Sequence, residues 1–305
     1  MQQLWNRRVL AAVVVVALAA GGAACTPGPP PVGGGSNCPL PAYPTAACTG
    51  VPAGTTLTTH QGDLRITTPG QVVDGLRVTG SVDVRAHDVV IRNSEVRGRI
   101  INDLGGTRYR FTIEDSTVGS TTGCSSWGNG AVGVADYTAR RVRIAGFPDG
   151  FRVAGSNIRI EDSFVTLCSA NPDDHSDGIQ AYGAGGGSNI VIHHNTIDQR
   201  AVTNGAATSP IFIPNDGERQ GNQDVTVTVT DNLLAGGGYS LRVFGHLPFS
   251  APAVTGNKIV DGTWAYGPLD VTCSRIGSWA GNAVVAYDWS TGQVTRQVRA
   301  LNDCA

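Results

Sequence analysis

The sequence predicts an all-β protein folded as a right-handed parallel β-helix, a solenoid in which every coil adds one strand to each of several stacked sheets. Three observations lead to this prediction. A string of alternating apolar residues followed by a polar corner recurs along the chain, and aligned copies repeat the same residue types at the same positions. Glycine is abundant while methionine is almost absent, a composition that suits tight turns and short strands better than long helices.

The recurring string builds two columns when its copies are aligned. The clear copies are VVIRNSEV (89–96), FTIEDSTV (111–118), IRIEDSFV (158–165), IVIHHNTI (190–197), VTVTDNLL (227–234) and PAVTGNKI (252–259). The polar column contains Ser94, Ser116, Ser163, Asn195, Asn232, Asn257 and Asn282, and the apolar column contains Val96, Val118, Ile144, Val165, Ile197, Leu234, Ile259 and Val284. Most steps measure about 21 to 26 residues, the length of one solenoid coil. We expect a continuous core along the apolar column and side-chain hydrogen bonds along the polar one.

A second set of strings predicts a further strand in each coil. These are DGLRV (74–78), DGFRV (149–153), DGIQA (177–181), SPIFI (209–213) and YSLRV (239–243). The fourth residue of each string lies between apolar or small neighbours, and these residues are expected to face outward as a ladder of Arg77, Arg152, Gln180, Phe212 and Arg242. Arginines beside an aromatic ring suit carboxylate-bearing sugars, through bidentate contacts and stacking. An ordinary solvated face is the alternative.

The N-terminal segment predicts export. Two arginines precede an apolar stretch and a run of small residues, as in a signal peptide over 1–24, and a Pro/Gly-rich tether follows over 25–37. Cys25 directly follows the small residues and is the expected lipidation site, with simple secretion after nearby cleavage as the alternative. The β-helix domain is expected over 38–305, outside the cell, with the lipid anchor as its only contact with a membrane.

The remaining cysteines form an even set in an oxidising compartment. Pairing of sequence neighbours joins Cys38 with Cys48, Cys124 with Cys168, and Cys273 with Cys304. A zinc site is not favoured, because no C-x-x-C pair occurs. The formal net charge of −2 leaves no basic stripe for nucleic acid, and we expect a monomer.

Three features of the sequence are typical of one family: coils of the form S-N-I-x-I-x-x-N-x-I, the string HSDGIQ (175–180) and the string PAGTTL (52–57). In these features the chain resembles secreted bacterial right-handed parallel β-helix proteins of the pectate lyase-like superfamily. The resemblance implies the fold and a polysaccharide partner, but the superfamily contains lyases, polygalacturonases, uronan epimerases and members without known activity. The polygalacturonase strings do not occur together here. The Asp-Asp-His of 173–175 is similar to the Asp-Pro-His of alginate epimerases, with Asp174 in place of the proline.

The segment NPDDHSDGIQAYG (171–183) is the richest in titratable groups. Asp173 and Asp174 are candidate ligands for calcium, and His175 is a candidate for proton transfer. Asp149 and Asp177 occupy equivalent places on neighbouring coils, roughly 5 Å apart. Two carboxylates at that distance share a proton or a cation. The alternative is a polar loop with Asp-Gly turns.

These residues define the functional hypotheses. Asp149, Asp177 and His175 would act with Arg152 and Arg242 in catalysis, where an arginine holds a uronate carboxylate or abstracts a proton. Substrate-binding candidates are Gln180, Tyr182, Phe212 and His194. The first hypothesis is a lyase or epimerase acting on an acidic glycan, with calcium as the candidate cofactor. The second is a non-catalytic module that binds glycan or cell-wall polymer, and the third is a purely structural solenoid.

Overall fold

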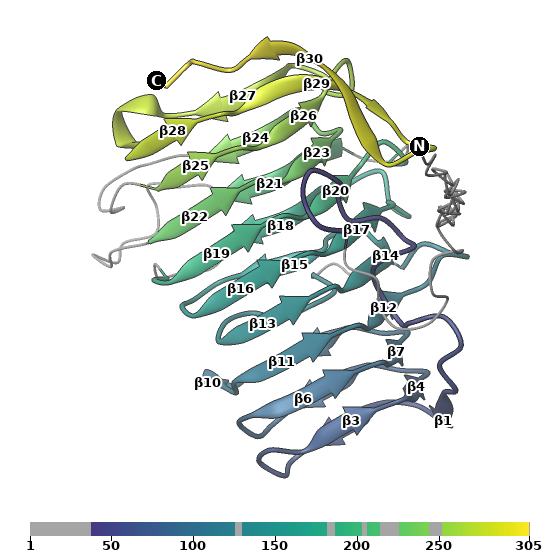
Figure 1. Ribbon diagram of the computed structural model, residues 1–305. Helices are drawn as coiled ribbons and strands as arrows, with labels where there is room; N and C mark the ends of the chain where they lie inside the picture. Colours follow the sequence, from purple (N-terminus) through teal and green to yellow (C-terminus); the bar gives the residue numbers. More distant parts are fainter. Residues whose placement is uncertain are drawn as a thin grey trace, which may run out of the picture. The chain divides into compact units, whose positions relative to one another are not determined.

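The computed structural model describes residues 38–125, 130–181, 187–202, 206–213, 226–243 and 252–304. These residues form a right-handed parallel β-helix whose coils rise from the first strands to the C-terminal strands (Figure 1). The all-β fold predicted from the repeats is therefore confirmed. In the described residues the only helix is the short 3-10 turn η1 (Cys273–Arg275), and no helix there is long and apolar enough to cross a membrane.

Three parallel sheets, here called A, B and C, form the faces of the solenoid. Sheet A contains β1 (Thr58–His60), β4 (Leu76–Val78), β7 (Glu95–Val96), β12 (Thr117–Gly119), β14 (Arg143–Phe147), β17 (Phe164–Leu167), β20 (Thr196–Asp198), β23 (Leu233–Ala235), β26 (Lys258–Val260), β29 (Ala283–Asp288) and the antiparallel β30 (Gln293–Ala300). Sheet C contains β3 (Val72–Asp74), β6 (Val89–Arg92), β11 (Phe111–Glu114), β13 (Tyr137–Arg140), β16 (Ile158–Glu161), β19 (Ile190–His193), β22 (Val227–Thr230), β25 (Ala253–Thr255) and β28 (Ser278–Ala280).

Sheet B has two parts. The first contains β2 (Leu64–Ile66), β5 (Val82–Val84) and β8 (Ile100–Ile101), and the second contains β15 (Phe151–Val153), β18 (His175–Ala181), β21 (Ala206–Ile213), β24 (Tyr239–Val243) and β27 (Gly267–Val271). Bridges from Ile100 to Val132 and from Val132 to Phe151 join the two parts. A small antiparallel pair, β9 (Asp103–Leu104) and β10 (Thr107–Arg108), projects from an early coil.

The strand registers confirm both predicted columns. Val96, Val118 and Ile144 pair in succession in sheet A, and the pairing continues through Val165, Ile197, Leu234, Ile259 and Val284. The polar column bonds along the stack: the backbone N–H of Ser94 donates to Ser116 Oγ at 3.1 Å, and that of Asn195 donates to Asn232 Oδ1 at 2.9 Å. These buried groups are thus satisfied by the neighbouring coil.

The polar corner of each repeat bends the chain from sheet C into sheet A. Its first residue, directly before the polar-column position, adopts a left-handed backbone conformation, which glycine tolerates without cost and asparagine and aspartate tolerate better than most residues. The residues are Gly75, Asn93, Asp115, Arg141, Asp162, His194, Asp231, Gly256 and Gly281, all with positive φ. A two-residue corner with this backbone conformation in every such coil keeps the strands in register.

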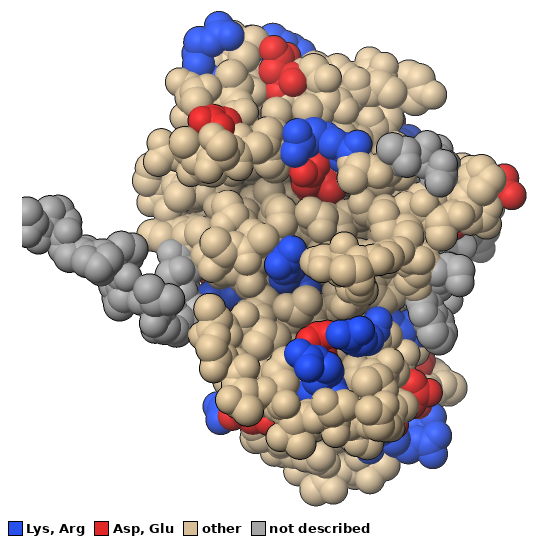
Figure 2. Space-filling view, turned by 90° about the vertical axis from the view of Figure 1, so that its right-hand side faces the viewer, with Lys and Arg blue, Asp and Glu red and all other residues tan. Residues whose placement is uncertain are grey.

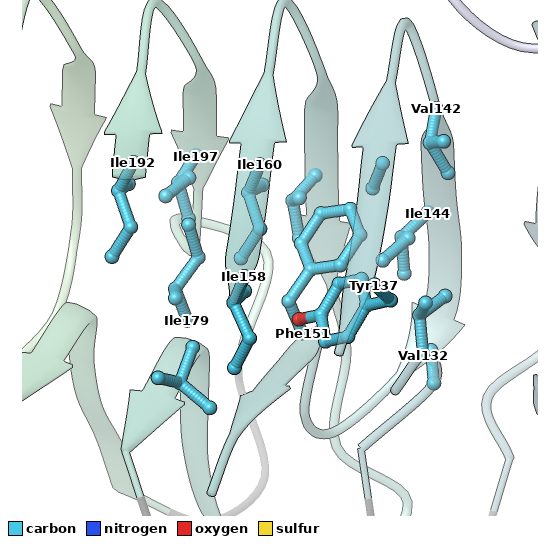
Figure 3. Packing of buried hydrophobic residues seen from close by; sticks show 14 of the residues in the cluster. Val132, Tyr137, Val142, Ile144, Phe151, Ile158, Ile160, Ile179, Ile192 and Ile197 are labelled. Atoms are coloured by element: carbon cyan, nitrogen blue, oxygen red, sulfur yellow. The ribbon is translucent and has the colours of Figure 1, made fainter. Parts of the chain in front are cut away.

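Apolar side chains from all three sheets fill the interior. Figure 3 shows isoleucines from successive strands stacked along the axis, beside the rings of Tyr137 and Phe151. The Tyr137 ring also stacks on Phe111 at a centroid distance of 5.5 Å, and its hydroxyl donates to the Arg152 carbonyl at 2.9 Å. β-Branched side chains suit such a core, because they pack well on a pleated surface.

Three disulfides join the predicted pairs, Cys38–Cys48, Cys124–Cys168 and Cys273–Cys304. They are consistent with an extracellular protein. The predicted signal peptide, tether and Cys25 lie outside the described residues.

Residues 38–51, here called the strap, cross the outer face of sheet A before the first strand. The Gly50 N–H donates to the Arg141 carbonyl at 2.8 Å, and the Val51 N–H donates to Thr117 Oγ1 at 3.2 Å. Tyr43 of the strap is buried and packs in a cluster with side chains of β23, β26 and β29. The strap therefore binds coils that are far apart in the sequence.

Charged side chains on this side of the molecule are largely paired. On the face shown in Figure 2, which carries the strands of sheet A, blue and red side chains lie next to one another on a mostly uncharged surface. Arg77, for example, donates to Glu95 at 2.8 Å, and Arg97 donates to the same carboxylate at 2.9 Å. No large field of one sign extends over the face that the figure presents.

Candidate functional site

The outer face of sheet B brings together four of the predicted site residues. Arg152 pairs with Gln180, Gln180 with Phe212, and Phe212 with Arg242, and Asp270 of β27 continues the row. Their strand neighbours Phe151, Ile179, Ile211 and Leu241 are buried in the core. Because side chains alternate along a strand, the five residues of this row face outward. We call the row the sheet B ladder.

Arg77 does not belong to the ladder, so this prediction was wrong. Arg77 lies in β4 of sheet A, where it pairs with Glu95 in register and in an ion pair. The string DGLRV resembles DGFRV, but in DGLRV the Asp-Gly is the corner that follows a strand of sheet C. The two similar strings therefore lie on different faces of the coil, DGLRV at sheet A and DGFRV at sheet B.

Arg242 contacts an acidic side chain and two aromatic rings at the ladder. Its Nε and Nη2 donate to Asp270 Oδ2 at 3.2 and 3.1 Å. Its guanidinium carbon lies 4.6 Å from the centre of the Phe212 ring and 5.8 Å from that of Tyr239. Both distances are within the range of attraction between a cation and an aromatic face. Asp270 and the rings together orient the guanidinium.

Arg152, Gln180 and Asp177 form a chain of hydrogen bonds at the other end of the ladder. Arg152 Nη1 donates to Gln180 Oε1 at 2.6 Å, and Gln180 Nε2 donates to Asp177 Oδ2 at 2.7 Å. Asp177 is only 1% exposed and lies beneath the ladder rather than in it. The carboxylate therefore fixes the orientation of the Gln180 amide from below.

Asp149 and Asp177 occupy neighbouring coils, as their strings indicate. The backbone N–H of Asp177 donates to Asp149 Oδ1 at 3.0 Å. Burial raises the pKa of Asp177 well above its ordinary value, the charge of Asp149 raises it further, and Arg242 and Arg152 oppose this. Burial also raises the pKa of Asp149. Asp177 Oδ1 is buried and has no hydrogen-bond partner among the described residues, so the pair favours retention of a proton.

The segment before β18 forms a turn. Asp174 Oδ2 accepts from Ser169 Oγ at 2.9 Å and from the Asn171 N–H at 3.2 Å, while Asp173 is exposed. His175 is exposed at the first position of β18 and, when charged, lowers the pKa of Asp149. Within the part of the chain that the structure describes, no three or more His, Cys, Asp or Glu side chains form a group suited to a metal ion. The calcium ligands thus stay a prediction.

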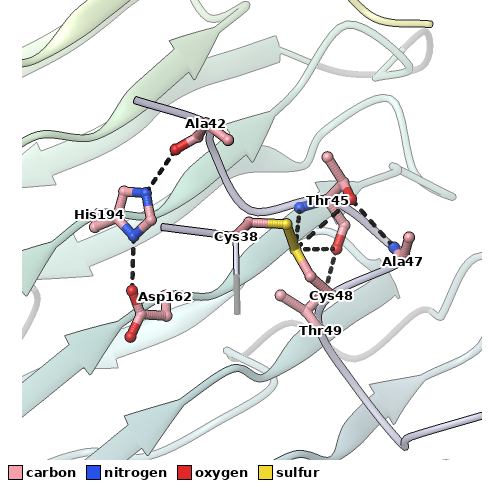
Figure 4. Close-up of a disulfide and its surroundings, with 8 residues drawn as sticks. All are labelled: Cys38, Ala42, Thr45, Ala47, Cys48, Thr49, Asp162 and His194. Carbon is pink, nitrogen blue, oxygen red and sulfur yellow. Dashed lines mark hydrogen bonds and ion pairs between the residues drawn. A yellow bond between two sulfur atoms is a disulfide. The ribbon is translucent and has the colours of Figure 1, made fainter. Parts of the chain in front are cut away.

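His194 lies at a different place, the corner between β19 and β20. Its Nδ1 is 2.6 Å from Asp162 Oδ1 and its Nε2 is 2.9 Å from the carbonyl oxygen of Ala42 in the strap (Figure 4). Burial opposes the charge of His194, but the bonds to Asp162 and Ala42 raise its pKa above the ordinary value. With an acceptor at each ring nitrogen, the imidazolium donates twice and fastens the strap. The structure does not bring His194 to the ladder.

Other predicted residues could not be placed, and some residues at the site were missed. Tyr182 lies outside the described residues, as do the segments 214–225 and 244–251 that follow β21 and β24. Sequence reasoning missed Asp270, Tyr239 and Tyr266. The string GPLDV (267–271) matches YSLRV in its apolar positions, and this alignment would have added Asp270 to the ladder.

In comparisons with known proteins, no family model, curated protein or solved structure matches this chain. The fold defines the class as a parallel β-helix protein. Any function must be inferred from the side chains of the site.

Proposed function

We propose that the protein binds an acidic polysaccharide along the sheet B ladder. The observation that carries this proposal is the guanidinium of Arg242, held over Phe212 at 4.6 Å by its ion pair with Asp270. A guanidinium presents paired planar donors to a carboxylate, and the ring beside it offers a flat surface to a sugar. Gln180 and Arg152 continue the polar row over two more coils. Uronate polymers repeat a carboxylate and a sugar ring along an extended chain, which suits such a row.

The proposed location is outside the cell, on a lipid anchor at Cys25. The disulfides and the signal-like N-terminal segment support it. The parallel β-helix and its repeat strings support membership of the pectate lyase-like superfamily. In a detergent phase-separation assay on expressing bacteria, the full chain should enter the detergent phase and its Cys25→Ser variant should not. Equal partitioning of both would contradict the anchor.

Binding is tested by isothermal titration calorimetry with polygalacturonate, alginate and hyaluronate oligomers. We expect Arg242→Gln to weaken binding of the preferred oligomer by about tenfold or more, because a charge-assisted hydrogen bond contributes about 1.5–3 kcal/mol. Arg77→Gln is the matched control, since Arg77 also pairs with a carboxylate but lies on sheet A. Equal affinity of the Arg242 variant and the wild type would contradict the proposal.

Catalysis is a second candidate, because Arg152, Arg242 and the exposed His175 all lie on strands of sheet B. In this hypothesis Arg152 or Arg242 removes the proton next to the uronate carboxylate. His175 would then give a proton to the glycosidic oxygen as its bond to carbon breaks, or, in epimerisation, to the opposite face of the same carbon. Elimination would create an unsaturated uronate that absorbs ultraviolet light, and epimerisation would invert the carbon without that absorbance.

The assay follows ultraviolet absorbance and the proton spectrum of each oligomer, with calcium or with a chelator. Asp173 and Asp174 are the proposed calcium ligands. A calcium-dependent product that is absent with the His175→Ala variant would support catalysis. Unchanged oligomers that nevertheless bind would leave the protein as a binding module.

A further inference from the structure

Two tyrosines extend the sheet B ladder toward the starts of its last strands. Tyr239 is the first residue of β24, and Tyr266 directly precedes β27. Their ring centroids are 5.8 Å apart and the rings are tilted by 48°. Tyr266 is 80% exposed, compared with 47% and 51% for the other exposed large hydrophobic side chains of the described residues, Leu40 and Val72. An exposed aromatic ring beside a second ring needs an explanation, since large aromatic side chains usually bury most of their surface.

The backbone supports both rings closely. A Cβ atom on Gly238 would lie 3.1 Å from Tyr266 Cδ2, and one on Gly267 would lie 3.2 Å from Tyr239 Cε1. Both contacts are tighter than a side chain normally allows, so the two glycines let the rings lie against the backbone. The Tyr266 N–H also donates to the Gly238 carbonyl at 2.8 Å. The backbone of Tyr266 is therefore fixed by this hydrogen bond, although its ring is exposed.

The tyrosines are continuous with the cationic part of the ladder. The Tyr239 ring lies 5.8 Å from the guanidinium carbon of Arg242, which in turn lies 4.6 Å from Phe212. An extended ligand with a carboxylate at Arg242 would place its next unit over the tyrosines. A pyranose ring has a face of C–H groups that packs on an aromatic ring, and the tyrosine hydroxyl can bond to the sugar hydroxyls at the edge.

We propose that Tyr239 and Tyr266 form a stacking subsite for one pyranose ring, next to the sugar whose carboxylate contacts Arg242. This rests on the proposed binding of an acidic glycan. The subsite recognises the ring and not its charge. Tyr266 is thus assigned a role in affinity for the sugar backbone, whereas Arg242 selects uronates.

The test compares oligogalacturonate with its methyl ester, which has the same rings without the charge. Calorimetric titrations use the wild type, Tyr266→Ala, Tyr266→Phe and Arg242→Gln, with Val72→Ala as the exposed apolar control. We expect Tyr266→Ala to weaken binding of both ligands equally, by about 2-fold to 10-fold. Tyr266→Phe should keep most of the affinity, and Arg242→Gln should weaken binding of the acid only.

The outcomes separate the two proposals. If the wild type binds the acid and Arg242→Gln weakens it, but Tyr266→Ala binds both ligands like the wild type, the stacking subsite is wrong and the acidic-glycan proposal stands. If Tyr266→Ala weakens binding of both ligands while Arg242→Gln changes neither, the subsite stands and selection of the acid by Arg242 is wrong. If the wild type binds neither ligand nor the other uronate oligomers, both proposals are overturned.

Discussion

Replacement of Asn232 by alanine tests whether the polar column stabilises the solenoid. Asn232 is fully buried, and its side chain makes four hydrogen bonds. Its Oδ1 accepts from the backbone N–H of Asn195 at 2.9 Å and from Asn195 Nδ2 at 3.0 Å. Its Nδ2 donates to the Ile192 carbonyl at 3.1 Å and to Asn257 Oδ1 at 2.9 Å. The side chain thus links three successive coils.

The expected loss of stability in Asn232→Ala depends on which polar groups are left without a hydrogen-bond partner. Asn195 Nδ2 keeps its bond to the Ile160 carbonyl, and Asn257 Oδ1 keeps the backbone N–H of residue 232. The backbone N–H of Asn195 loses its acceptor inside the protein, which costs about 1–3 kcal/mol. The lost bonds to the other groups add about 1 kcal/mol. We therefore expect Asn232→Ala to lower the free energy of unfolding by about 3 kcal/mol.

Urea unfolding followed by far-ultraviolet circular dichroism measures this loss, with the disulfides intact and the m-value checked for cooperativity. Asn232→Ser is the matched control, because serine fills this column at Ser116 and Ser163. There its Oγ accepts the same kind of backbone N–H, at 3.1 Å in both cases. The serine variant should recover part of the stability. A loss below about 1 kcal/mol for alanine, or equal losses for alanine and serine, would refute the reasoning.

Three further predictions concern other parts of the fold. The pKa of His194 is raised in the folded protein, so the protonated ring stabilises the fold fully below the ordinary pKa of 6.5, and this contribution is lost as the pH rises through the folded pKa. In thermal melting curves, the difference in melting temperature between the wild type and His194→Asn should therefore narrow toward alkaline pH. The pKa of Asp177 is also raised, so as the pH rises above the ordinary value of 3.8 the free energy of unfolding of the wild type should fall relative to that of Asp177→Asn. An equal pH dependence of the two proteins across acid and neutral pH would contradict this. Gly119→Ala should lower the free energy of unfolding by at least about 2 kcal/mol, because a Cβ there would overlap the carbonyl oxygen of Ala145. Gly105 also has a positive φ but open space around it, so Gly105→Ala should lower the same quantity by about 1 kcal/mol in the same urea assay.

The repeat made much of the fold predictable. In a solenoid each residue contacts its equivalent one coil later, so aligned strings directly identify neighbours in space. Val96 and Val118 are paired for this reason, and so are Arg152 and Gln180 of the ladder. The disulfide pairs were predictable too, because the bonded cysteines are neighbours in the sequence, separated by 10, 44 and 31 residues, or at most about two coils.

Contacts outside the repeat were not predictable. Ala42 is 152 residues from His194, and nothing in the strap resembles a coil, so its contact with the His194 ring left no pattern in the sequence. The assignment of Arg77 failed for a related reason. A five-residue likeness shows that two segments form similar strands, but only the position within the coil determines which sheet each strand joins.

The burial of Asp177 changes the balance between the functional hypotheses. A general acid or base must reach the sugar, and a carboxyl group that is 1% exposed beneath Gln180 does not reach a ligand on the outer face. Its raised pKa widens the pH range in which the side chain is neutral, and the carboxyl in either form can orient the Gln180 amide, which the proposed ligand would contact. Arg242, by contrast, is oriented by an anion on one side and a ring on the other, both at the surface of the same sheet. This geometry supports the proposal of a preorganised binding surface, and chemistry at this face would depend on the arginines and His175 rather than on the buried Asp177.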